Sequence, residues 1–122
     1  MITRKEWARK QSRCWICGRT CNLETHEIAN GAARQKALKE PCTWMRACCR
    51  CHRGDHGLHS ASHWPLARQL ALKLLRDHAH FDRSKVLKLK GFADTAVTRG
   101  EIIGWAEKMT RPISETLSEM EL

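Results

Sequence analysis

The sequence predicts a small α+β protein, in which a core of two strands and one helix, clipped together by cysteine pairs, precedes a helical extension. Cys-x-x-Cys pairs begin at Cys14 and Cys48 and enclose a segment with the β-branched bias of a strand. Apolar residues at helical spacing fill much of the chain after residue 64. At 122 residues the chain has the size of one domain. We expect the core over 1–60, the helical extension over 61–112 and a flexible acidic tail over 113–122.

The elements of the core follow from local signals. Thr3-Arg-Lys-Glu6 is a capping-box pattern that opens a helix to about residue 12, and Gly18 suits the tight turn of the cysteine knuckle CWICGRTC. A strand is expected over residues 22–29, ended by Asn30-Gly31, and a turn or two of helix over 32–40. A second strand over 42–47 and a helix from 48 to about 56, with Gly57 as its terminator, complete the core.

The extension is predicted to be helical throughout. Trp64-Pro65 opens a helix with an apolar stripe, Asp82 caps a second helix that Gly91 ends, and Thr98-Arg-Gly-Glu101 is a capping box for a third that Pro112 ends. The stripe is expected to pack against the core or the later helices and consists of Leu66, Ala67, Leu70, Ala71, Leu74 and Leu75.

The charge distribution predicts a polyanionic partner. Lysine and arginine number 22 against 13 acidic residues, and residues 1–92 hold 19 of the basic and 7 of the acidic side chains. Nucleic acid is therefore the expected partner. An anionic membrane surface is the runner-up, but no lipidation motif or amphipathic N-terminal anchor supports it, and no segment is apolar over the length of a bilayer. The basic N-terminus lacks the apolar region of a secretory signal, so we expect a cytoplasmic, reducing environment.

Seven cysteines in a reducing environment favour metal over disulfides. Two knuckles, each with two thiolates, complete a closed tetrahedral site, and structural zinc at such a site contributes about 10 kcal/mol or more to folding. The alternatives are ordinary buried thiols or disulfides. The expected ligands are Cys14, Cys17, Cys48 and Cys51, whereas Cys21, Cys42 and Cys49 are expected to be small buried residues.

Histidines predict a second metal site. His52 and His56 are four residues apart, so on one helix their imidazoles project from the same face, and a strand packed across that helix brings His26 opposite them. Three nitrogen ligands leave coordination positions open, as a catalytic metal requires. The alternative is that these histidines are exposed and only add to a basic nucleic-acid-binding face.

The order CWIC, ETHEI and TWMRACCRCHRGDH, over residues 14–59, resembles the zinc-clipped HNH endonucleases, including small phage and bacterial members. This resemblance implies a ββα-metal fold in which His26, His52 and His56 hold a catalytic divalent metal, Mg²⁺ or Mn²⁺, with Zn²⁺ or Ni²⁺ as alternatives. The family's general-base histidine corresponds to Glu27 here, and its asparagine falls on Thr43. Both departures leave the metal ligands in place and alter the catalytic groups.

The resulting expectation is a metal-dependent endonuclease that hydrolyses phosphodiester bonds in duplex or branched DNA, with His26, Glu27 and Thr43 as catalytic residues. The alternatives are a catalytically silent HNH-like module that binds nucleic acid or protein, and a purely structural zinc adaptor. The sequence leaves the oligomeric state open. Basic residues expected to contact backbone phosphates are Arg34, Lys36, Lys39, Arg46, Arg50 and Arg53.

Overall fold

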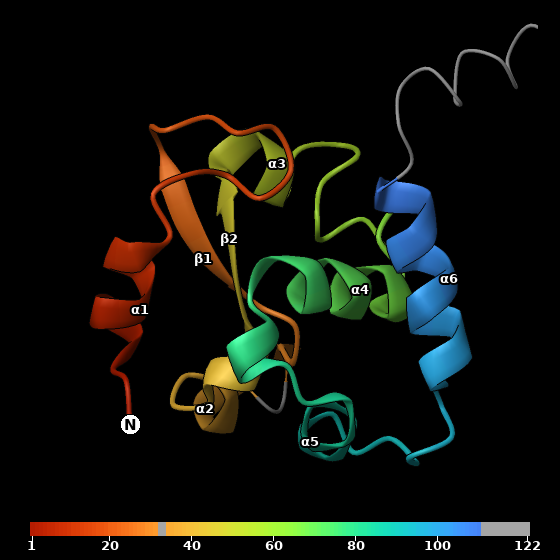
Figure 1. Cartoon of the computed structure of the whole chain (residues 1–122). Coiled ribbons are helices and arrows are strands. Elements are labelled where there is room, and N and C mark those ends of the chain that lie inside the picture. Colours follow the sequence, from red (N-terminus) through yellow and green to blue (C-terminus); the bar gives the residue numbers. More distant parts are fainter. Residues whose placement is uncertain (32–33, 111–122) are drawn as a thin grey trace, which may run out of the picture.

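The computed structural model describes residues 1–31 and 34–110, and its fold is α+β, with helices around a two-stranded antiparallel sheet. Figure 1 shows α1 on one side of the hairpin, and α4 with α6 on the other. The predicted tail, 113–122, lies outside the described residues. The elements are α1 (Arg4–Lys10), β1 (Leu23–Glu27), α2 (Arg34–Ala37), η2 (Pro41–Thr43), β2 (Trp44–Cys48), α3 (Cys49–Arg53), α4 (Leu66–Arg76), η3 (His78–His80), α5 (Arg83–Leu89) and α6 (Arg99–Thr110).

The hairpin register separates the side chains of β1 between two faces. His26 is opposite Met45, and Glu27 is opposite Trp44. Because side chains alternate along a strand, Glu24 and His26 share one face of the sheet, while Glu27 lies on the other. The second strand starts at Trp44 and not at residue 42, because residues 41–43 form a 3₁₀ turn that begins with proline.

An aromatic cluster forms the centre of the core. The ring of Trp7 in α1 meets Trp15 and Trp44 edge to face, with centroid separations of 5.7 and 5.6 Å. Its indole Nε1 donates to Asp77 Oδ2 at 2.8 Å, a residue seventy positions along the chain. The first helix is thereby joined to the C-terminal end of α4.

Lys73 is a fully buried cation inside this core, with a side-chain exposure of 0%. Its Nζ donates to Pro41 O, Trp44 O and Asp77 Oδ2 at 2.8, 2.8 and 2.7 Å. Three acceptors use all three hydrogens of an ammonium, so the buried charge is both hydrogen-bonded and paired. Burial lowers the pKa of Lys73, and the hydrogen bond to Asp77 works against that shift.

The helical extension follows the sequence closely. Asp82 caps α5 by accepting from Lys85 N, and Thr98 and Glu101 form a reciprocal capping box at the start of α6. The buried face of α4 differs from the expected apolar stripe, because Leu72 and Lys73 are buried while Leu75 is exposed. The buried lysine supplies hydrogen-bond donors to the carbonyls of Pro41 and Trp44 at the start of β2. Sequence periodicity does not predict such a contact.

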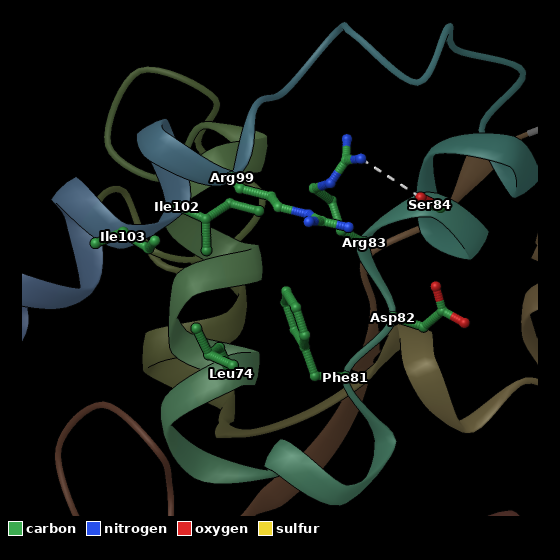
Figure 2. A pocket seen from close by; sticks show the side chains of 8 residues that line it. All are labelled: Leu74, Phe81, Asp82, Arg83, Ser84, Arg99, Ile102 and Ile103. Atoms are coloured by element: carbon green, nitrogen blue, oxygen red, sulfur yellow. Dashed lines mark hydrogen bonds between the residues drawn. The ribbon is translucent and has the colours of Figure 1, made fainter.

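A pocket of about 300 Å³ lies between the end of α4, the segment leading into α5 and the start of α6. Figure 2 shows Leu74, Phe81 and Ile102 around it, with the guanidinium groups of Arg83 and Arg99 along one side. Arg83 is already engaged, since it donates to the carbonyl of Val97 and pairs with the Asp94 carboxylate. Among the described residues, no helix combines the length and the apolar character needed to cross a membrane.

Candidate metal centres

The four predicted cysteines converge on one point. The Sγ atoms of Cys14, Cys17, Cys48 and Cys51 all lie within 4.8 Å of one another. Cys17 Sγ and Cys48 Sγ are 3.7 Å apart. Two sulfurs bound to one tetrahedral zinc at 2.3 Å are separated by about 3.8 Å. The cluster therefore has the donor set and the spacing of a structural zinc site.

The first knuckle is shaped for this role by its own backbone. Gly18 has φ +78°, a conformation that glycine adopts without strain, and its N–H donates to Cys14 O. Trp15 N donates to Arg46 O at 3.0 Å, which attaches the knuckle to β2. Since Cys48 ends β2 and Cys51 lies in α3, the cluster joins three elements.

The electrostatics of the four thiols favour a bound cation. Burial opposes ionisation of Cys14, but hydrogen bonds from the backbone of Cys17, Cys48 and Ile16 outweigh it and lower its pKa to about 7. Burial and the neighbouring thiols raise the pKa of Cys51. Four adjacent thiols cannot all ionise without a positive charge between them, and a divalent metal supplies that charge.

Three histidines, His26, His52 and His59, form a second cluster. His26 Nδ1 lies 3.1 Å from His52 Nε2, and His59 Nε2 lies 2.9 Å from the same atom. Nitrogens bound to one tetrahedral metal at 2.0–2.1 Å are separated by about 3.3 Å. His26 and His52 are buried and His59 is exposed, so the cluster meets solvent at His59.

Gln69 in α4 fixes the tautomer of His26. Its Nε2 donates to Leu58 O and Trp64 O at 3.2 and 3.0 Å, which uses both amide hydrogens and turns Oε1 toward His26 Nε2 at 2.8 Å. Since Oε1 can only accept, the hydrogen of His26 is on Nε2. Burial lowers the pKa of His26 to about 3, so the ring is neutral and its Nδ1 lone pair faces the cluster.

Glu24 has the equivalent role for His52. Its Oε1 accepts from His52 Nδ1 at 2.8 Å and from Arg53 Nε at 3.1 Å. Bonding to these two donors lowers the pKa of Glu24, with the hydrogen bond from His52 as the largest cause. A carboxylate behind a histidine orients the ring for metal binding and strengthens it as a ligand. His52 Nε2 thus also faces the cluster.

The two tautomers create a local conflict that a cation resolves. His26 Nδ1 and His52 Nε2 both present lone pairs across 3.1 Å, and lone pairs so close repel each other unless a proton or metal lies between them. Burial disfavours a proton on His26. The donor set, the spacing and the carboxylate and amide behind the rings fit a transition metal such as Zn²⁺.

His59 occupies the place for which the sequence predicted His56. The predicted helix to about residue 56 is too long, because α3 ends at Arg53 and Gly54 is extended, with ψ 172°. The argument from four-residue spacing on one helix therefore does not apply. His56 lies outside the cluster of three, and its ring packs on exposed His63 with a centroid separation of 4.1 Å.

A sharp return of the chain brings His59 back to His52. Leu58 N donates to Cys51 O, and His59 N donates to His52 O. A Cβ at Gly57 would lie 2.7 Å from Cys51 O, so only glycine permits this close approach. The signal in the sequence is thus the glycine at position 57, which permits a chain reversal in addition to ending a helix.

Glu27 is directed away from the histidine cluster. It lies on the opposite face of the sheet from His26, and its Oε1 pairs with Arg4 in α1 at 2.8 Å. The carboxylate is largely buried, with 10% of its side chain exposed. The structure therefore does not bring the predicted general base against the three imidazoles.

Thr43 has a structural role in the loop that follows β1. It is fully buried, its Oγ1 accepts from Ala29 N at 2.7 Å, and its carbonyl accepts from Ile28 N. The predicted catalytic threonine thus clips the chain leaving β1 to the chain entering β2.

The predicted phosphate-binding residues divide into two groups. Arg46 is half-buried and donates to Thr25 Oγ1 and Gln11 O, while Arg53 is engaged with Glu24. The exposed members without such a role in the sheet are Arg34, Lys36, Lys39 and Arg50. Of the spare cysteines, Cys42 is buried as expected, and burial raises its pKa to about 11, whereas Cys21 and Cys49 are exposed.

Comparisons with known proteins identify no relative. A scan against protein-family models, a search of curated proteins and a search of solved structures each give no match to this chain.

Proposed function

We propose that this protein is a metal-dependent endonuclease of the HNH type, which hydrolyses phosphodiester bonds in DNA. The observation that carries the proposal is the convergence of three imidazole nitrogens, of His26, His52 and His59, on one point that meets solvent. Three protein ligands at a site reached by solvent leave a position for water or substrate, unlike the closed four-sulfur cluster.

The charge of the protein supports a phosphate substrate. The formal net charge is +9, and Arg34, Lys36, Lys39 and Arg50 are exposed. Electrostatic attraction of this kind binds the nucleic-acid backbone without reading its sequence. A divalent metal at the histidine cluster would supply Lewis-acid stabilisation of charge on the scissile phosphate.

The roles of the residues follow from their contacts. His26, His52 and His59 would hold the metal, Gln69 and Glu24 keep two of these rings in the ligating tautomer, and the cysteine cluster fixes α3 relative to the hairpin. Glu27 stays our prediction for the general base, and its ion pair with Arg4 holds its carboxylate on the other face of the sheet.

A plasmid-nicking assay tests the proposal. Purified protein is incubated with supercoiled plasmid and, in separate reactions, Mg²⁺, Mn²⁺, Zn²⁺ or Ni²⁺. We expect nicking with at least one ion, and a loss of about a hundredfold or more in H59A. H56A is the matched control, because it removes an exposed imidazole three residues away and should nick normally. Absence of nicking with every ion, or equal nicking by H59A, overturns the proposal.

A second candidate is a silent HNH-like module that binds nucleic acid or a protein. The ion pair of Glu27 with Arg4 favours it, because a buried, paired carboxylate is poorly placed to take a proton from water. Nicking by the unaltered protein distinguishes the candidates: DNA binding that weakens with salt, without nicking in any ion, favours the silent module, and E27Q tests the assignment of the base. A large loss of nicking with retained metal binding supports Glu27 as the base, whereas unchanged nicking removes it from the mechanism.

A further inference from the structure

A cationic and aromatic groove lies between the cysteine knuckle, α4 and α6, and none of the cysteines or histidines of the two candidate metal centres lines it. Its volume is about 340 Å³, which is within the size of a small-ligand site. No acidic side chain is among the residues that line it. The residues that give the groove its character are Trp15, Trp64, Arg68, Arg76, Trp105 and Lys108.

Arg68 is held rigidly at the centre of this groove. Its guanidinium carbon lies 3.9 Å from the ring centroid of Trp64 and 5.3 Å from that of Trp105. Nη1 donates to His63 O, while Nε is buried and has no hydrogen-bond partner among the described residues. Burial lowers the pKa of Arg68, in keeping with a cation taken partly out of water. Arginine held flat on aromatic rings is a platform for planar groups.

The cations of the groove form no ion pair with the part of the chain that the structure describes. Within residues 1–31 and 34–110, none of Arg68, Arg76 and Lys108 forms an ion pair, although several other cations of the protein do. Lys108 Nζ lies 4.9 Å from the Trp105 ring centroid, and Arg76 Nε reaches Trp15 O at 3.4 Å. Bringing three like charges to one groove is unfavourable unless an anion joins them. The groove therefore suits a ligand that is both anionic and planar.

We propose that this groove binds a single-stranded segment of nucleic acid. Unpaired nucleotides combine a phosphate with an exposed aromatic face, and they bind to proteins through cations and through stacking on aromatic or guanidinium planes. A duplex keeps its bases stacked inside, so it cannot use the planar groups of a groove of this size. The exposed cations Arg76 and Lys108 contact phosphates, and Arg68 with Trp105 contacts the base.

The groove is connected to the histidine cluster through Trp64. The guanidinium of Arg68 lies over the Trp64 ring. The backbone carbonyl of Trp64 accepts from Gln69, the residue that orients His26. Arg68 and Gln69 are consecutive residues of α4, so the groove and the histidine cluster are both attached to this helix. The role of the bound strand as a cleavage substrate rests on the proposed endonuclease function, whereas its binding does not.

The test measures binding of a fluorescent single-stranded oligonucleotide by anisotropy, in the H59A background so that cleavage cannot deplete it. R76A/K108A should bind at least about tenfold more weakly. The slope of log affinity against log salt should also be smaller in magnitude by about 1.4, because each lost phosphate contact on a single strand removes about 0.7. R68K and W105L should also weaken binding. K5A/K10A, in α1 on the far side in Figure 1, is the charge-matched control.

The outcomes separate this inference from the proposed function. Weak binding by the groove variants with normal binding by the control supports the inference, even if the unaltered protein never nicks DNA. Equal loss in the control, equal affinity for a duplex of the same length, or equal affinity for polyglutamate overturns it. Thermal unfolding of R76A/K108A should stay close to the parent, because both side chains are exposed and the lost hydrogen bond from Arg76 to Trp15 O is long, at 3.4 Å. A much lower midpoint would assign these cations a structural role and count against the proposal.

Discussion

Gln69 Oε1 and His26 Nε2 are 2.8 Å apart, and this one contact determines which nitrogen of His26 is available to a metal. The amide cannot turn over, because its Nε2 is held by the carbonyls of Leu58 and Trp64.

Substitution of Gln69 should therefore weaken metal binding without removing a ligand. We expect Q69L to lower the affinity of the histidine cluster by about 10- to 100-fold, as is usual when a ligand histidine loses the partner behind it. The measurement is titration of Co²⁺ into protein whose cysteine cluster is loaded with zinc. Unchanged affinity in Q69L would contradict an orienting role.

The identity of the third histidine ligand can be checked by metal content. H59A should lose the ion of the histidine cluster, whereas H56A should retain it, because His56 packs on His63 outside the cluster. Metal analysis after dialysis against a weak chelator gives the ratio of metal to protein for each variant. Loss of the second ion in H56A with retention in H59A would mean that the spacing of four residues is the relevant one after all.

Removal of one cysteine of the four-thiol cluster should unfold the core. The cluster joins the knuckle, β2 and α3, and structural zinc contributes about 10 kcal/mol or more to folding, so C17S should lose zinc and show a non-cooperative thermal transition. C21S is the matched control, since Cys21 is exposed and outside the cluster. A C17S protein that melts like C21S would show that these thiols are ordinary cysteines.

The sequence was sufficient for the cysteine cluster and insufficient for the histidine cluster, for a physical reason. A Cys-x-x-Cys pair is a self-contained turn, so its spacing alone places both sulfurs, as at Cys14 and Cys17. The histidines depend on where α3 ends, and that end is set by Gly54 and by the close contact at Gly57, which are properties of the folded backbone. Alternation along β1, in contrast, is a local property, and it puts Glu24 on the face of His26 and Glu27 on the other.

Thr43 offers a test of structure against chemistry. T43V keeps the shape but removes the acceptor for Ala29 N, and an unsatisfied buried donor costs about 1–3 kcal/mol. Chemical denaturation should show this loss, and T43S, which keeps the hydroxyl, should be much closer to the parent. If T43V is as stable as T43S but fails to nick plasmid, Thr43 acts in catalysis and not in the fold.

Acid should destabilise the core through Asp77. Burial would raise its pKa, but hydrogen bonds from Lys73, Trp7 and His80 outweigh burial, so the pKa is lowered. The stabilisation is therefore complete above the ordinary aspartate pKa of about 3.9 and is lost as the pH falls through the lower folded-state value. D77N leaves Lys73 buried without a counter-charge and should cost about 3–5 kcal/mol at neutral pH. Denaturation of D77N that declines with acid as steeply as the parent would assign the acid sensitivity to other groups.

Cys48 is at once the last residue of β2, the residue that caps α3 and a member of the thiol cluster. No linker separates β2 from α3, so the position of Cys48 in the thiol cluster sets the direction in which α3 leaves the sheet. His52 lies one helical turn after Cys48, so the thiol cluster also sets the position of His52. We therefore expect the two centres to fill in order: a chelator that removes metal from the four thiols should also lower the affinity of the three imidazoles for a second ion.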